Sequence, residues 1–308
     1  MYKKHFLNSD GFVHMLMLLA IILAASSFPV GALITNDLPP EILMFLRFLL
    51  ATVMFAPFVL TQHGVTPPSK RCLFNYIILS IPLVVFFWCM FESLRYTSVL
   101  NTGALYTIVP AITAICALLI NRELTGRLRS LGLIIGTVGA LWIVFRGNLD
   151  ALLSLQLNYG DLIFFLGCIF LGLYNPLVRR FHSGEPMIVM TFWVMLFGSI
   201  WLLIASAKNI MHVNWINVQH DVYAGILYLS LFSTLITFLI INLSTVRLGA
   251  TKVAAYGFLT PVIVIVLSIL LGIESFEWVT LPGLLLIMSA MLIIQRDKSQ
   301  STVKITQS

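Results

Sequence analysis

The second half of this 308-residue chain repeats the pattern of its first half at an offset of 151 positions. Pro110 recurs as Pro261 and Gly132 as Gly283, and each pair lies within similar runs of apolar residues. Each half contains an odd number of apolar segments long enough to cross a membrane, so two similar units would sit upside down relative to one another. Inverted repeats of this kind are typical of secondary transporters.

The composition places the chain in a membrane. Its mean hydropathy is +1.00, 59% of its residues are hydrophobic and only 10% are charged, whereas soluble proteins carry roughly a quarter charged residues. The net charge of +6 would suit a nucleic-acid partner in a soluble protein. Here the basic residues are spread over short loops, so we expect the lipid bilayer and no nucleic acid as the partner.

Apolar runs of about 20 residues match the roughly 30 Å hydrocarbon core of a bilayer. The fold class predicted is an all-α membrane protein with ten transmembrane helices, arranged as two inverted five-helix repeats. We expect these helices at 12–34, 41–61, 72–93, 97–120, 128–146, 159–179, 187–206, 221–244, 250–271 and 278–295. The first repeat then covers 12–146, the second covers 159–295, and 296–308 forms a disordered cytoplasmic tail. The first run continues to about Leu33, which favours a retained span over a cleaved signal peptide.

The distribution of Lys and Arg predicts the orientation. With ten spans both termini lie on one side, and that side would hold 14 basic residues against 3 on the other. Because short cytoplasmic loops are enriched in Lys and Arg, we expect a multi-pass protein of the cytoplasmic (inner) membrane with both termini in the cytoplasm.

Several segments resemble the EamA family of the drug/metabolite transporter superfamily. They are PPEILMFLRFLLA with Pro40 and Arg47, FESLRYTSVLNTGALYTIVP ending at Pro110, and STVRLGATKVAAYGFLTP ending at Pro261. The resemblance implies a ten-helix carrier with a central cavity, which exports or exchanges small metabolites such as amino acids, nucleosides or drug-like compounds. One departure is that Trp193 takes the place of Arg47 when the second repeat is aligned on the first.

Pro110 and Pro261 are predicted hinges near the middle of the fourth and ninth spans. Each removes a helix hydrogen bond and leaves a carbonyl free, which a membrane tolerates only where protein or cavity water satisfies that carbonyl. The alternative is a static kink, since proline is common in membrane helices. Recurrence at equivalent positions favours the hinge.

Ionisable groups inside a span are functional or paired by default. Trp88, Glu92 and Arg95 share one helical face at spacings of four and three, which predicts a site for an amine or for protons. An ion pair that only fixes packing explains Glu92 equally well. Arg47 lies six residues inside the second span, about 9 Å by helical rise. It could contact an anionic substrate, but an ion pair or snorkelling to the outer interface is the favoured interpretation.

Amide and phenol side chains buried in lipid need partners and therefore face the interior of a bundle. They serve either as helix–helix contacts or as ligand contacts, and Tyr174-Asn175-Pro176 is expected to interrupt the sixth span. The complete set of substrate-binding candidates is Trp88, Glu92, Asn101, Tyr106, Tyr174, Asn175, Asn242 and Tyr256. Most phenylalanines are expected to face lipid or pack in the core.

The sequence favours transport over catalysis. It contains no HExxH, GxSxG or phosphate-binding P-loop motif, and its six histidines lie nearly all in tails or loops, so neither an enzyme nor an ATP-driven pump is expected. The four cysteines have no paired spacing, and we expect no metal or cofactor. A membrane scaffold or receptor is the alternative, but it leaves the duplication unexplained.

A GxxxG pattern at Gly132 and Gly136 predicts close helix packing. This packing fits contacts within one chain or across a homodimer equally well. Glu123 and Glu274 fall at span ends, where capping and turn formation explain them.

Overall fold

The structure, a computed structural model, describes residues 10–64, 68–97, 99–123, 126–145, 147–148, 150, 158–270 and 278–296. Within these ranges the regular structure is entirely helical and contains no strand. Glu274 and the predicted tail beyond Arg296 lie outside the described residues.

Among the described residues seven helices are long and apolar enough to cross a membrane, so the chain is a multi-pass integral membrane protein. They are Gly11–Ile34, Pro40–Gln62, Lys70–Ser93, Tyr159–Phe181, Met187–Ile210, His220–Leu248 and Ala250–Leu267. Shorter apolar helices cover Val109–Asn121 and Trp278–Ile294. Seven of the ten expected spans thus have a counterpart of crossing length, and the expected span at 97–120 is divided into two helices.

The first half of the chain contains helices α2 to α8. Their bounds are α2 Asp10–Ala25, α3 Ser27–Ile34, α4 Pro40–His63, α5 Lys70–Ser93, α6 Val99–Tyr106, α7 Val109–Asn121 and α8 Arg127–Val144. Local chemistry sets several of these ends. Pro39 and Pro40 open α4, where a proline costs no helix hydrogen bond, and the Ser69 side chain caps α5 by accepting from the Cys72 amide.

The second half begins with three long segments. These are α10 Tyr159–Phe181, α11 Met187–Ile210, and a third segment built from α12 His220–Tyr228, the π-helix η1 Leu229–Ile236 and α13 Thr237–Leu248. The remainder consists of α14 Ala250–Ala255, the 3-10 turn η2 Tyr256–Leu259, α15 Thr260–Leu270, the 3-10 turn η3 Trp278–Thr280 and α16 Leu281–Arg296. A capping box between Asn158 and Asp161 begins α10.

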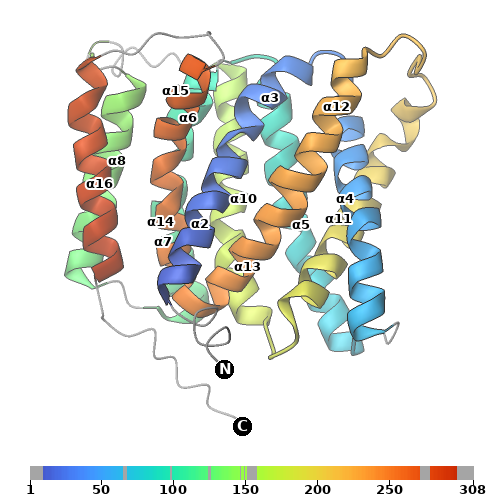
Figure 1. Cartoon of the computed structure of the whole chain (residues 1–308), viewed down its shortest axis with the longest axis horizontal. Helices are drawn as coiled ribbons and strands as arrows, with labels where there is room; N and C mark the ends of the chain where they lie inside the picture. Colours follow the sequence, from blue (N-terminus) through green and yellow to red (C-terminus); the bar gives the residue numbers. More distant parts are fainter. Residues whose placement is uncertain are drawn as a thin grey trace.

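The helices form one bundle in which segments distant in sequence lie side by side (Figure 1). α8 packs along α16 at one edge and α4 along α11 at the other, while α5 and α10 pack together between them. α2 begins and α16 ends at the same end of the bundle (Figure 1).

The GxxxG stripe of α8 is covered from within the chain. A Cβ atom added at Gly139 would lie 2.9 Å from the Gly283 carbonyl oxygen of α16, and one added at Gly132 would lie 2.6 Å from Ile294. A Cβ at Gly136 would meet the Phe258 ring at 2.8 Å. These glycines let two helix backbones approach closely, so the motif serves packing inside one chain.

Candidate functional site

Both predicted hinge prolines lie in the first turn of an α-helix, Pro110 after a break in the chain's helical structure and Pro261 after a 3-10 turn. α6 ends at Tyr106 and α7 begins at Val109, so Pro110 is its second residue. Pro261 is likewise the second residue of α15, after the 3-10 turn η2. A first-turn proline lacks only an N–H that would be unbonded anyway. For Pro110 the expected loss of a helix hydrogen bond is therefore wrong, because α6 ends before it. For Pro261 the loss stays a prediction, because α14, η2 and α15 follow one another without interruption.

The break between α6 and α7 contacts the 3-10 turn η2. A Cβ atom added at Gly257, within η2, would lie 3.1 Å from Cε1 of Tyr106 and 3.9 Å from Cγ of Pro110. Gly257 therefore lets the 3-10 turn of the second half pack directly on the broken segment of the first.

Tyr106 also belongs to a closed ring of four aromatic side chains from four helices. Its ring centroid lies 5.7 Å from that of Phe28 on α3 and 6.4 Å from that of Phe86 on α5. Phe164 on α10 closes the ring, 6.1 Å from Phe28 and 6.4 Å from Phe86. These are favourable aromatic separations. We call these four residues the aromatic ring cluster.

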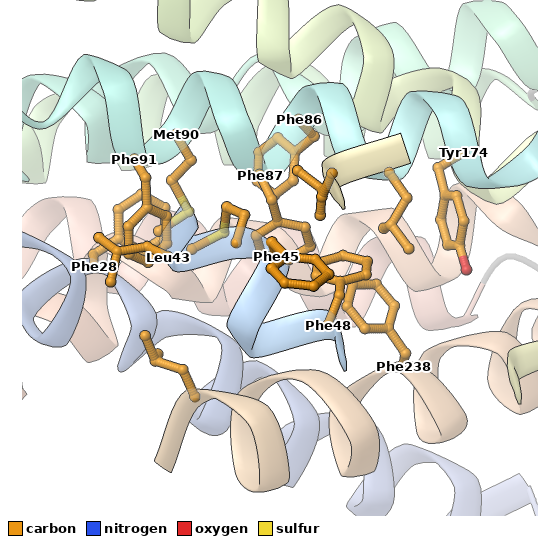
Figure 2. Close-up of a cluster of buried hydrophobic side chains, with 14 of the residues drawn as sticks. Phe28, Leu43, Phe45, Phe48, Phe86, Phe87, Met90, Phe91, Tyr174 and Phe238 are labelled. Atoms are coloured by element: carbon orange, nitrogen blue, oxygen red, sulfur yellow. The ribbon is translucent and has the colours of Figure 1, made fainter. Parts of the chain in front are cut away.

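The aromatic contacts continue from this cluster across the interior (Figure 2). Phe86 lies 5.0 Å from Phe87, Phe87 lies 5.6 Å from Phe238, and Phe238 lies 6.0 Å from Tyr174. Sequence patterns did not single out these phenylalanines, because apolar aromatics are common throughout every span. Only the packing separates the interior rings from the lipid-facing ones.

Arg47 lies inside this aromatic interior and is fully buried, with 0% of its surface exposed. Its Nε donates to the Thr234 hydroxyl at 2.5 Å, and its NH2 contacts the Ser233 carbonyl oxygen at 3.2 Å. The guanidinium carbon lies 4.4 Å from the Phe87 ring centroid and 5.8 Å from that of Phe91. The favoured expectation of snorkelling or an ion pair is wrong, since among the described residues no carboxylate pairs with Arg47.

The hydrogen-bond partners of Arg47 belong to a helical segment of irregular geometry. Ser233 and Thr234 lie in the π-helix η1, where Thr237 donates its hydroxyl to the Phe232 carbonyl five residues earlier at 2.9 Å. The Ser233 hydroxyl also bonds to that of Ser27, at the junction of α2 and α3. π-helical turns occur frequently at functional sites. Ser27, Arg47, Ser233 and Thr234 are called the Arg47 cluster below.

Tyr174 and Asn242 form a buried polar chain across three helices. The Tyr174 hydroxyl donates to Oδ1 of Asn242 at 2.9 Å, and Nδ2 of Asn242 donates to the Thr191 hydroxyl at 2.9 Å. The expected interruption at Tyr174-Asn175-Pro176 is wrong, because α10 runs continuously through Pro176. Asn175 is 7% exposed, and its side-chain oxygen has no partner among the described residues.

Tyr256 is buried in η2, and its hydroxyl bonds to the His14 imidazole of α2. His14 therefore lies within a membrane-crossing helix, unlike most of the histidines. The Asn101 side chain lies outside the described part of the structure.

Trp88 and Glu92 lie in the last two turns of α5, where the Glu92 side chain is 15% exposed. Trp88 is 37% exposed. Glu92 is bonded to Arg95 at 3.3 Å near the end of α5. Its negative charge also raises the pKa of the nearby exposed Tyr96 phenol. The structure therefore does not bring these two candidates together with Tyr106, Tyr174 or Asn242.

Polar contacts join α10 to the first half near both of its ends. The Thr97 hydroxyl donates to Asp161 at 2.6 Å near the start of α10, and Arg179 pairs with Glu123 at 2.6 Å near its end. These two polar contacts hold α10 against the first half near both of its ends.

Two cavities open elsewhere. One of about 460 Å³ lies beside the loops at Asp37 and Asn214, and one of about 630 Å³ lies between α4, α5 and α11 near Tyr76 and Glu185. Neither is lined by the Arg47 cluster. Among the described residues no group of three His, Cys, Asp or Glu side chains is placed to hold a metal ion.

Comparison with known proteins gives a consistent result. Residues 11–145 and 158–296 each match the EamA-like transporter family. The chain is 27% identical over 225 residues to the uncharacterized transporter YyaM of Bacillus subtilis, covering 73% of this chain and 74% of that protein. It is 24% identical over 249 residues to an uncharacterized transporter of Archaeoglobus fulgidus, covering 80% and 85%.

A solved crystal structure has a similar fold, with a TM-score of 0.72 at 14% sequence identity. The likeness extends over 92% of this chain and 96% of that one.

Proposed function

The chain belongs to the EamA-like transporter family, and we propose on this premise that it is a secondary transporter of a small metabolite. It works by alternating access, in which two units rock about a site near the middle of the membrane. This proposal requires neither catalysis nor a cofactor.

The two units are the segments 12–146 and 159–295, each with five membrane crossings and of opposite orientation. Reciprocal contacts support this arrangement. A Cβ atom added at Gly139 of α8 would lie 2.9 Å from the Gly283 carbonyl oxygen of α16, and one added at Gly132 would lie 3.3 Å from the Ala290 carbonyl oxygen. The 151-residue offset relates Gly132 to Gly283 and Gly139 to Ala290. A pseudo-two-fold axis between the units would exchange these two contacts.

The observation that carries the function is the contact between the break that precedes Pro110 and the 3-10 turn that precedes Pro261. Transporter sites are commonly formed by discontinuous helices at the interface of inverted repeats. Tyr106 and Gly257 meet there, with Pro110 and Pro261 one turn away. In the proposed mechanism this contact opens when the two units separate.

The substrate is an amino acid, a nucleoside or a drug-like compound, and the direction is export or exchange. The aromatic ring cluster supports an amphipathic substrate, since its four rings present apolar faces beside the Tyr106 hydroxyl. The basic residues support cytoplasmic termini in the inner membrane.

A growth screen tests the proposed function. Cells that overproduce the protein would be challenged with toxic amino-acid analogues, nucleoside analogues and drug-like compounds, alongside cells that carry an empty vector. We expect resistance to at least one class, together with lower cellular content of a labelled compound from that class. Unchanged growth and unchanged content throughout would contradict export and favour a receptor or scaffold.

A further inference from the structure

We propose that the transported molecule is an organic anion with a single carboxylate on an apolar body, and that Arg47 binds the carboxylate. This inference rests on the proposed transport function and narrows its substrate to an acidic drug-like compound, which excludes nucleosides and zwitterionic amino acids. It begins with a charge that the structure buries without a counterion.

The Arg47 guanidinium is fully buried, and no carboxylate within the described ranges forms an ion pair with it. A charge in the membrane interior is costly and is either paired or functional. The Phe87 and Phe91 rings and the hydroxyl of Thr234 offset only part of that cost. An arriving anion would supply the counterion that the chain itself does not.

The hydrogen bonds leave one edge of the guanidinium available. Nε is engaged by Thr234, whereas NH1 has no partner among the described residues. NH2 donates to the Ser233 carbonyl oxygen at 3.2 Å, with its hydroxyl oxygen at 3.4 Å, and keeps its second hydrogen for another acceptor. A carboxylate can accept from NH1 with one oxygen and from NH2 with the other, in the bidentate geometry that arginine favours.

The backbone around this edge joins both halves of the chain. Arg47 belongs to α4 of the first half, and its partners belong to η1 of the second. Ser27, at the junction of α2 and α3, closes the cluster through Ser233. An anion bound here would therefore act on the contact between the two units that alternating access must move.

The surroundings select the class of anion. The single positive charge of Arg47 is balanced by a ligand with one negative charge, and the surrounding aromatic rings suit an apolar body on that ligand. A phosphate dianion would bring a second negative charge that nothing here balances. An amine would be repelled by the guanidinium. The single carboxylate is thus the group that this site matches.

The test uses three probes of similar size with the same phenyl group and different charge. Phenylacetate is an anion, 2-phenylethanol is neutral and 2-phenylethylamine is a cation. Binding to the purified full chain in detergent is measured as a concentration-dependent rise in melting temperature. We expect phenylacetate to bind at least about tenfold more tightly than either other probe, as a charge-assisted bidentate contact allows.

Arg47→Gln should abolish that preference, and Arg71→Gln, which changes an exposed arginine of α5, should retain it. If Arg47→Gln does not fold, Arg47→Lys keeps the charge and should retain a weaker preference for phenylacetate. Equal affinity for the three probes, binding of none of them, or a preference that survives Arg47→Gln would overturn the inference. A cation or neutral compound exported in the growth screen would leave the transport function intact while refuting the carboxylate.

Discussion

The Glu123 carboxylate and the Arg179 guanidinium form an ion pair of 2.6 Å that joins the two halves of the chain. Glu123 follows the end of α7, and Arg179 lies near the end of α10. Their side chains are only 8% and 17% exposed. Glu123 thus has a long-range partner that capping alone did not predict, and loss of either member leaves the other charge largely out of water.

Arg179→Gln should lower the free energy of unfolding by ~1–3 kcal/mol, because Glu123 is left without its counterion. Arg180→Gln changes the exposed neighbour of Arg179 and should have little effect. Thermal unfolding in detergent measures both. The double variant Glu123→Gln with Arg179→Gln should recover part of the loss, and equal losses for Arg179→Gln and Arg180→Gln would refute the role of the pair.

Pro110→Ala and Pro261→Ala should each slow transport about tenfold while leaving membrane insertion unchanged, a barrier increase of ~1.4 kcal/mol. Alanine allows the preceding break or 3-10 turn to close into continuous α-helix, which removes the hinge. Pro57→Ala is the matched control, since Pro57 is exposed within the continuous helix α4. Initial rates normalised to the amount of protein in the membrane provide the measurement. Wild-type rates in both hinge variants would exclude a hinge at these positions.

Gly257→Ala should destabilise the protein by ~1–3 kcal/mol, because the new methyl group would press on the Tyr106 ring. Gly103→Ala is its control, since a Cβ there meets nothing within 4 Å. Combining Gly257→Ala with Tyr106→Leu should restore part of the stability, as judged by melting temperature. An undiminished melting temperature for Gly257→Ala alone would show that η2 and the break before Pro110 do not press on each other.

Glu92→Gln should leave a flux driven by a pH gradient unchanged. Glu92 pairs with Arg95 near the end of α5, away from the aromatic ring cluster, which favours the packing role that the sequence left open. Transport in vesicles, with and without an imposed pH gradient, measures the effect. A flux that loses its response to the gradient in this variant would instead identify Glu92 as the coupling group.

Local patterns predicted the helical class well and the contacts poorly. Runs of apolar residues determine which segments enter a membrane, so α4, α5, α10 and α11 were expected near their observed bounds. The break between Tyr106 and Val109 was not expected as a break, because hydropathy is the same on both sides of it. The Arg47 cluster also escaped prediction, since Ser27, Ser233 and Thr234 are unremarkable in sequence and meet only in space.

The sequence alone determined that this chain is an all-helical membrane protein with a duplicated pattern, because hydropathy and internal repeats are properties of the chain itself. Only the tertiary structure decided which way the polar groups face. Rotation of α4 about its axis turns Arg47 inward instead of toward the interface, and that rotation is set by packing against α11 and η1. The same packing leaves the Glu92 side chain 15% exposed and brings Tyr106 against Gly257, because close approach of helices depends on residues far apart in the chain.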